Sequence, residues 1–438
     1  MILALLTAAA LLTTPTVPNA KAVGVGTCAS LNEAISIAEA ADPRIVGASA
    51  DFKQAKAELE QVKSAWNTQF SLFARTGQGD GVLADNQVDN RIGAMLSHKL
   101  IDFDAGKLAR LSAEASVQSA DFSIHRAHKE VALDAAKAYL DVARFAERLD
   151  VAKQTDALAQ AQAGTVDDRV KQGTLTVLEA SQIQTEAARA AADVHQEQLS
   201  MDDATVTLQT LTAGKVSCIQ SESLTAVETA GPSVNADDTV TSALKQDPEL
   251  KQADDAIKRA QFDVAAALRE NWPSIDFSAT YTNDYDAFSR HLRPHRRVGF
   301  DFNFPVLRGG RRKADYDSAQ ARLQKARGER LEVENRIRHR VTSAVTRVIE
   351  LHEVQKQLVR IASQQHEYAI ALHAAYDQQN ATTDEVVDAD RTALRAQMDA
   401  IDAKYSLADA ITQVKADVEP SSVFAGNVAD SSPANAGN

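Results

Sequence analysis

The chain has 438 residues and a formal net charge of −13, from 47 lysine and arginine residues against 60 aspartate and glutamate residues. This acidic balance argues against non-specific binding to nucleic acid, which requires a basic surface. The chain is 44% hydrophobic and can bury a core, whereas its aromatic content of 5% is typical of long helices and unusual for a compact mixed enzyme domain.

Residues 1–22 have the features of a secretory signal peptide. Ile2–Leu12 is apolar except for Thr7 and is too short to span a bilayer. Ala20-Lys21-Ala22 offers a small-x-small cleavage pattern, so we expect cleavage after Ala22. The alternative is a short buried helix at this end. No later segment reaches 18 uninterrupted apolar residues, so we expect the mature chain to enter a membrane only as β-strands.

The sequence contains two cysteines, Cys28 and Cys218. In an exported protein an even pair predicts a disulfide, and two free thiols are the alternative. No histidine or third cysteine lies nearby at the spacing of metal ligands, so a zinc site is not expected.

The sequence contains a domain-sized duplication. Asp42-Pro43-Arg44-Ile45 recurs 205 residues later as Asp247-Pro248-Glu249-Leu250. Phe103-Asp104-Ala105-Gly106-Lys107 corresponds to Leu307-Arg308-Gly309-Gly310-Arg311, with an expected offset of 204. We therefore predict a first repeat over 23–230, a second over 231–420, and a disordered Ser/Ala/Asn/Gly-rich tail over 421–438.

Very long helices dominate each predicted repeat. Neither glycine nor proline interrupts Lys107–Ala163 or Thr174–Ala213, and the region from Glu329 to Glu419 is also free of proline and glycine. Apolar and alanine residues recur at seven-residue spacing, which is the a/d pattern of a coiled coil. A helix of about 60 residues would be about 90 Å long. Such helices cannot fold into one compact globule.

Each repeat also contains two predicted strands, about residues 68–76 and 92–101 in the first and 274–282 and 298–306 in the second. Apolar and polar residues alternate in all of them, and each is about ten residues long, the length of a transmembrane β-strand. The segments between paired strands, 76–90 and 283–297, are expected to be loops. His291 and His295 in the second are not expected to bind metal without further ligands, and its arginines suggest either contact with anionic lipid or polysaccharide or, more simply, a solvated basic loop.

Taken together, these features resemble the TolC-like outer-membrane channel proteins. The marks are the Asp-Pro pair that opens each half, the two strand-exit motifs, and the stretch Arg169-Val170-Lys171-Gln172-Gly173-Thr174 followed by Val177-Leu178-Glu179-Ala180. The resemblance covers nearly all of the mature chain. It implies an α+β fold in which a homotrimer builds a 12-stranded transmembrane β-barrel, four strands per protomer, continued by a long α-helical coiled-coil tunnel in the periplasm.

The resemblance implies the exit duct of a tripartite type I secretion or multidrug efflux system in the outer membrane. The implied partners are outer-membrane lipid, a periplasmic adaptor (membrane fusion) protein, and an inner-membrane ABC exporter or proton-driven pump. The pump would supply the energy, and the sequence has no phosphate-binding glycine loop, hydrolase motif or metalloprotease motif. We therefore expect no enzyme activity and no cofactor. The alternative function is a soluble periplasmic coiled-coil scaffold or adaptor protein.

The resemblance further implies that the tunnel closes at helix hairpins with turns near 172–176 and 378–384. The family's acidic constriction corresponds to Glu385-Val386-Val387-Asp388-Ala389. Glu385 and Asp388, three residues apart, would share one helix face and form acidic rings in a trimer. The alternative is a solvated acidic helix face.

The expected gate departs from the family pattern. Well-studied members join the hairpins with an aspartate in the first half and an arginine and a tyrosine in the second. The aspartate position aligns with Thr176 and the arginine position with Thr382 or Thr383, so only Tyr376, with Asp377 beside it, matches the pattern. Asp167, Asp168 and Arg169 could form another tie. The first hairpin is expected to be about two residues shorter than the second.

Overall fold

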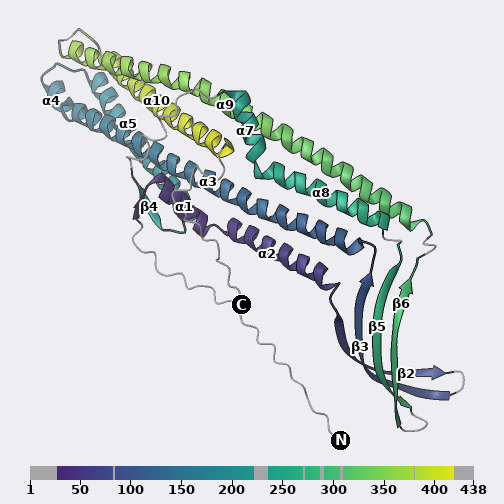
Figure 1. The fold of residues 1–438 in the computed structure, drawn as a ribbon. Helices are drawn as coiled ribbons and strands as arrows, with labels where there is room; N and C mark the ends of the chain where they lie inside the picture. The colour runs from purple at the N-terminus through teal and green to yellow at the C-terminus, as the bar shows by residue number, and fades with distance from the viewer. Residues whose placement is uncertain are drawn as a thin grey trace, which may run out of the picture.

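A computed structural model describes residues 27–81, 84–220, 235–269, 272–286, 291–305, 309–378 and 380–418. The expected signal peptide and the expected tail lie outside these residues. Long helices run along one axis and a β-sheet lies at one end of them (Figure 1). The elements, in chain order, are β1 (Thr27–Ala29), α1 (Leu31–Ala41), α2 (Pro43–Ser64), β2 (Gln69–Gly81), β3 (Ala84–Ile101), α3 (Ala105–Gly164), α4 (Val166–Lys171), α5 (Val177–Leu211), β4 (Val216–Ile219), α7 (Ala236–Gln246), α8 (Pro248–Arg269), β5 (Ser274–Asp286), β6 (His291–Asn303), α9 (Arg311–Asp377) and α10 (Thr383–Val418).

The two halves of the chain repeat the same elements at nearly constant offsets. α7, α8 and β5 begin 205 residues after α1, α2 and β2, and α9 and α10 begin 206 residues after α3 and α5. The expected offset of 204 at the strand exit is therefore wrong. It aligned Gly106 with Gly310, whereas the structure aligns Asp104 with Gly310. Both residues precede a long helix with positive φ, 71° for Asp104 and 85° for Gly310.

The long helices pack through small residues. α3 has 60 residues and α9 has 67, so they are about 90 and 100 Å long. Val131, Ala135, Ala138 and Val142 of α3 are buried in the main core cluster, at the alternating three- and four-residue spacing of a coiled-coil seam. Alanine at such positions lets neighbouring helix backbones approach closely.

The sheet has four antiparallel strands in the order β2-β3-β5-β6. Within the described residues, β2 and β6 each pair on one side only. The expected loops 76–90 and 283–297 are wrong over most of their length, because pairing continues to Gly81↔Ala84 and to Asp286↔His291. Their glycine-, asparagine- and arginine-rich composition predicts loops, but backbone pairing can extend a hairpin beyond the part whose side chains alternate.

One face of the sheet carries large exposed apolar side chains. Phe300, Phe302, Leu72 and Ile92 are 60%, 75%, 76% and 66% exposed. The opposite face of β6 carries Gly299, Asp301 and Asn303. This alternation is the two-residue period that the sequence predicts.

A close contact fixes the corner between the first hairpin and α3. The indole ring of Trp66 packs on the backbone of Gly106 so tightly that a Cβ atom there would lie 1.9 Å from the ring. Only glycine therefore fits at the second position of α3.

The middle of the helical body holds a short two-stranded parallel sheet, β1 with β4. Cys28 and Cys218 face each other across it and form a disulfide that joins segments 190 residues apart. The hydroxyl of the buried Tyr139 of α3 shares its one hydrogen between the carbonyl oxygens of Gln220, at 2.9 Å, and Ala29, at 3.3 Å. This sheet therefore fastens both ends of the first repeat to the long helix.

A buried ion cluster joins the two halves nearby. The Lys129 Nζ atom of α3 lies 2.8 Å from Asp417 Oδ1 and 3.4 Å from Asp247 Oδ2, and both aspartates are almost fully buried. Arg340 of α9 lies 2.7 Å from Asp247 and 3.3 Å from Asp417. Two cations thus face two anions, which is the condition for burying charge without a large net cost.

Candidate functional site

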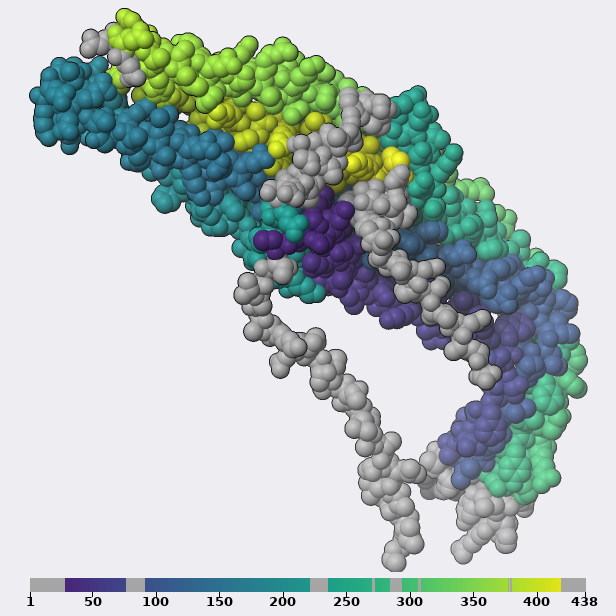
Figure 2. Space-filling model, turned by 60° about the vertical axis from the view of Figure 1, so that its left-hand side comes forward, coloured from purple at the N-terminus to yellow at the C-terminus, as the bar shows by residue number. Residues whose placement is uncertain are grey.

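The two hairpin turns lie at the end of the helical body farthest from the strands (Figures 1 and 2). One joins α4 to α5 across 172–176 and the other joins α9 to α10 across 378–382. Both turns thus have the same length, and the expected two-residue difference is wrong. The length of each turn is counted here between the observed helix ends, whereas the expected difference came from aligning the two sequences.

Equivalent capping boxes begin the helices that follow the turns. The Glu179 carboxylate accepts hydrogen bonds from the Thr176 backbone N–H at 2.8 Å and from the Thr176 hydroxyl at 2.7 Å. The Glu385 carboxylate accepts from the Thr382 backbone N–H at 2.7 Å and from its hydroxyl at 2.8 Å. Each glutamate thereby satisfies a backbone donor that has no partner inside the helix.

These hydrogen bonds favour the charged form of each carboxyl group. Bonds from Thr176, first its side chain and then its backbone, lower the pKa of Glu179. The Thr382 backbone N–H, followed by its hydroxyl, lowers the pKa of Glu385. Both groups are therefore ionised at neutral pH and place negative charge at a helix N-terminus, where the helix dipole stabilises it.

Four side chains from the two hairpins meet between the turns. The Arg169 guanidinium donates to the Tyr376 hydroxyl at 3.1 Å, and its Cζ lies 5.1 Å from the centre of the Tyr376 ring. The Tyr376 and Thr383 hydroxyls are 3.2 Å apart, and the Thr383 hydroxyl lies 3.5 Å from Glu179 Oε1. We call Arg169, Tyr376, Thr383 and Glu179 the hairpin contact.

Among the side chains that the structure describes, the other candidate gate residues make no hydrogen bond or ion pair from one hairpin to the other. Thr176 caps α5. Asp168 pairs with Lys171 of its own helix at 3.3 Å, and both side chains are exposed. Asp167 is exposed in the first turn of α4, and the side chain of Asp377 lies outside the described part of the chain. Of the five candidates whose side chains the structure describes, only Arg169 and Tyr376 are joined across the hairpins.

Sequence reasoning missed Glu179 and Thr383. The signal was present, because Thr176-x-x-Glu179 and Thr382-x-x-Glu385 are two capping boxes 206 residues apart. Sequence reasoning also missed an ion pair farther along the same helices. Arg391 of α10 binds Glu186 of α5, with 3.0 Å between Nε and Oε1. Glu186 raises the pKa of Arg391 by hydrogen bonding to its guanidinium.

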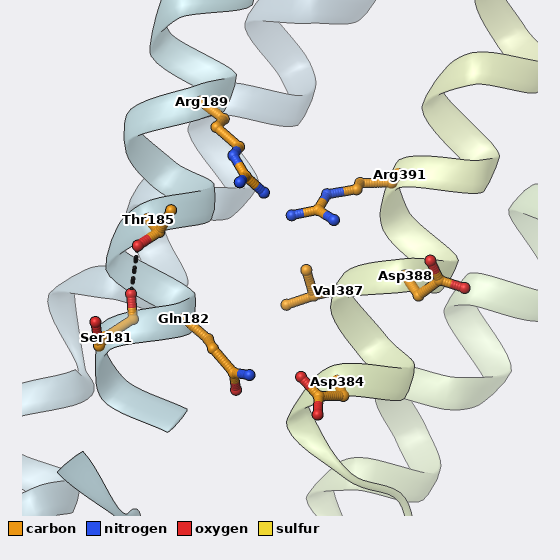
Figure 3. Close-up of a pocket in the computed structure, with 8 residues that line it drawn as sticks. All are labelled: Ser181, Gln182, Thr185, Arg189, Asp384, Val387, Asp388 and Arg391. Atoms are coloured by element: carbon orange, nitrogen blue, oxygen red, sulfur yellow. Dashed lines mark hydrogen bonds between the residues drawn. The ribbon is translucent and has the colours of Figure 1, made fainter. Parts of the chain in front are cut away.

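The expected acidic pair lies in the first two turns of α10. The Glu385 carboxylate bonds within its capping box, and Asp388 is exposed. Asp384, Val387, Asp388 and Arg391 form the α10 wall of a cavity of about 430 Å³ between α10 and α5. In Figure 3 the Val387 and Arg391 side chains point toward α5, whereas the Asp388 carboxylate points away from it. Asp388 therefore lies at the edge of this cavity, with its carboxylate on the side of α10 that does not face α5.

Among the residues that the structure describes, no three His, Cys, Asp or Glu side chains come together as a metal site. The His291 side chain lies outside them. The described helices include none that is long and apolar enough to cross a bilayer.

Comparison with models of known protein families identifies one family. A family model described as outer membrane efflux protein matches residues 34–214 and 239–416. No curated protein matches the chain in sequence.

Solved structures share the fold. VceC, an outer membrane protein of Vibrio cholerae, matches with a TM-score of 0.75 and 18% identity over 89% of this chain and 95% of its own. The CmeC outer membrane channel of Campylobacter jejuni matches with a TM-score of 0.74 and 14% identity, over 89% and 85%. The MtrE outer membrane channel of Neisseria gonorrhoeae, in its open state, matches with a TM-score of 0.71 and 16% identity, over 89% and 88%.

Proposed function

The chain belongs to the outer membrane efflux protein family, and we propose on that basis that three copies form the exit duct of a tripartite export system. It is an outer-membrane protein whose helices extend as a tunnel into the periplasm. This localisation excludes the soluble periplasmic scaffold that the sequence left open. The proposal includes a transmembrane barrel, a gate at the tunnel entrance and two partner proteins.

The observation that carries the proposal is the four-stranded sheet, whose outer strands β2 and β6 each pair on one side only within the described residues. In lipid, an unpaired strand edge leaves backbone N–H and C=O groups without partners, each at a cost of several kcal/mol. Four strands are too few for a closed barrel. Three copies supply twelve strands, an even number as in other bacterial barrels.

The hairpin contact supports a gate at the periplasmic end. Arg169 and Tyr376 come from different hairpins, so their hydrogen bond and ring contact hold the two hairpins together. Separating the hairpins requires the loss of both interactions. A partner that binds the hairpin tips and replaces these interactions would open the tunnel.

The proposed partners are those with which outer membrane efflux channels generally work. An inner-membrane ABC exporter or proton-driven pump would drive export, and a periplasmic adaptor would bridge the pump to the hairpin end. The similar CmeC and MtrE proteins are outer membrane channels, which supports the same role here.

Deletion of the gene tests the proposed function and identifies the cargo. Loss of a drug-efflux duct raises sensitivity to several unrelated toxic compounds, whereas loss of a type I secretion duct removes one or a few proteins from the medium. Wild-type protein restores either phenotype, and a barrel-defective Phe300→Arg variant does not. A deletion strain with unchanged drug sensitivity and unchanged secreted proteins would contradict an export role.

A further inference from the structure

A second cavity lies inside the helical body, farther from the hairpin turns than the cavity in Figure 3. Its volume is about 260 Å³, and its walls come from α3, α5, α9 and α10, so both hairpins contribute to it. Part of the lining is apolar: Leu158 and Ala159 of α3, Ala190 of α5, Ala369 of α9 and Leu394 of α10. These walls suit the hydrocarbon part of a small molecule.

The ion pair between Glu186 and Arg391 lies between the two cavities, because Arg391 lines both of them. Arg189 Nη1 of α5 also lies 3.6 Å from Glu186 Oε2. In Figure 3 the Arg189 and Arg391 side chains extend toward each other from α5 and α10. Two arginines thus neutralise Glu186, so this carboxylate offers no free charge to a ligand.

Polar side chains of the second hairpin bond to one another at the cavity wall. His373 Nε2 of α9 lies 2.8 Å from Asp390 Oδ1 of α10. Gln397 Nε2 of α10 lies 3.5 Å from His366 Nδ1 of α9. Asp390 therefore already has a partner, as Glu186 does.

Asp193 of α5 is the carboxylate of this cavity that lacks a partner. No hydrogen bond or ion pair joins its side chain to another residue in the described part of the chain. Burial, followed by the charges of Glu186 and Glu197, raises the pKa of Asp193. A positive charge beside Asp193 would offset this repulsion. Asp193 is also exposed at the rim of the cavity, so a ligand can reach it.

The lining selects one class of ligand. An anion would be repelled by Asp193, and a neutral apolar molecule would leave its carboxylate without a partner. A metal ion is disfavoured, because no three metal-ligating side chains come together among the described residues. An ammonium group on a hydrocarbon body satisfies both the carboxylate and the apolar walls.

We propose that this cavity binds a small amphipathic amine, with its ammonium group at Asp193 and its hydrocarbon body between the four helices. A primary ammonium group has three N–H donors. The side-chain carbonyl oxygens of Gln154, Gln162 and Gln397, which also line the cavity, can accept those that Asp193 does not. The site goes beyond the proposed duct, because it lies within one chain and does not depend on the number of copies.

A bound amine would also hold the two hairpins together. Asp193 and Ala190 belong to the first hairpin, whereas Ala369 and Leu394 belong to the second. A ligand that contacts both hairpins binds best when they are close and shifts the population toward that arrangement. This second step rests on the proposed gate and means that the amine favours the closed duct.

Isothermal titration calorimetry of the full chain, purified from outer membranes in a non-ionic detergent, tests the site. Benzylamine is the probe, and benzyl alcohol is its neutral counterpart of nearly the same shape. The wild type should bind one benzylamine per chain and bind benzyl alcohol several-fold more weakly.

Two variants locate the bound amine. Asp193→Asn should weaken benzylamine binding about tenfold, as expected for the loss of one charged hydrogen bond. Asp203→Asn is the matched control and should bind like the wild type, because Asp203 is an exposed carboxylate of the same helix outside the cavity. Leu158→Ser should weaken binding several-fold by removing an apolar contact while the charge remains. Circular dichroism confirms that each variant is folded.

Several results would overturn the site. These are no binding of benzylamine to the wild type, equal affinity of Asp193→Asn and Asp203→Asn, and equal binding of benzylamine and benzyl alcohol. Displacement of benzylamine by an equal concentration of Mg²⁺ would show a site for any cation and would also overturn the proposal.

Planar bilayer recordings test the effect on the hairpins. Benzylamine on the periplasmic side should lower the open probability of the wild type and have less effect on Asp193→Asn. An unchanged open probability at concentrations that saturate the site would overturn this second step. A wild-type protein that forms no channel would reject the proposed duct, whereas calorimetry would still decide whether the cavity binds the amine.

Discussion

At the scale of single residues, Arg169 makes two contacts with one side chain of the other hairpin. Its guanidinium donates to the Tyr376 hydroxyl and also lies over the ring of Tyr376. A cation over an aromatic ring contributes about 0.5–1 kcal/mol at an exposed site, and a hydrogen bond from a charged donor about 1.5–3 kcal/mol.

Arg169→Ala should therefore favour the open duct. Loss of both contacts removes about 2 kcal/mol of closed-state stabilisation in each protomer. Planar bilayer recordings should show a higher open probability than the wild type. Lys171→Ala is the control, because Lys171 pairs only with the exposed Asp168 of its own helix. Equal behaviour of the two variants would remove Arg169 from the gate.

Glu385 and Asp388 carry a second prediction at this scale. If they line the proposed tunnel entrance, six carboxylates in three copies raise the local cation concentration there. The wild-type channel should prefer cations and be blocked by trivalent ions from the periplasmic side. Glu385→Gln with Asp388→Asn should weaken both properties and leave the trimer intact, whereas residues on a solvated helix face would change neither.

The sequence analysis named two of the four residues of the hairpin contact as gate candidates. Tyr376 was identified by its place in a family pattern, and Arg169 by its charge near the turn. Glu179 was missed because the aspartate position of the family was aligned with Thr176, three residues earlier. The capping boxes mark where α5 and α10 begin, but they do not show which side chains meet across the hairpins. Arg169 and Tyr376 are 207 residues apart, so only the folded chain shows that they touch.

At the scale of elements, α5 and α10 depend on ionised glutamates for their first turns. A lowered folded-state pKa means that the stabilisation is present at neutral pH, above the unfolded value, and is lost as the pH falls through the folded value. The N-termini of both helices should therefore loosen as the pH falls below about 4.

Amide hydrogen exchange measures this loosening. Protection of the Thr176 and Thr382 amides, each bonded to a capping carboxylate, should fall in acid once the intrinsic pH dependence of exchange is removed. In Glu385→Gln, the neutral amide oxygen can still accept the hydrogen bond, so protection of Thr382 should lose its acid transition while Thr176 keeps it. Acid transitions in both amides of the variant would show that Glu385 is not the titrating group.

The sheet gives a matched prediction on one strand. Phe300→Arg places a charge on the apolar face at mid-strand and should cost about 2–4 kcal/mol of barrel stability in lipid. Asn303→Arg places the same charge on the opposite, polar face and should be mild. The fraction of protein assembled in the outer membrane measures both effects, and equal damage would mean that the two faces have been confused.

Element types followed from period and composition, whereas element lengths did not. The seven-residue repeat of α3 and α9 and the alternation in β6 indicated helix and strand directly. β2 and β3 include residues 76–81 and 84–90 because backbone pairing continues where side-chain alternation stops. Pairing with a neighbouring strand decides where such strands end, and the sequence of one strand alone does not show how far that pairing extends.

At the scale of the whole molecule, the duplication bears directly on the proposed assembly. One chain already contains the repeat-to-repeat contact once, through β3–β5 pairing and α3–α8 packing. The buried Lys129, Asp247, Asp417 and Arg340 cluster fixes the two halves in that relation. A ring of three such chains would alternate this contact within copies with an equivalent one between copies.

The central claim is that three copies of this chain form one duct in the outer membrane, and the copy number of the complex tests it most directly. Native mass spectrometry of protein extracted gently from purified outer membranes gives that number. The account predicts a complex of three mature chains that dissociates into single chains on heating. A single chain from the outer membrane, or recovery of the protein only in the soluble periplasmic fraction, would contradict it.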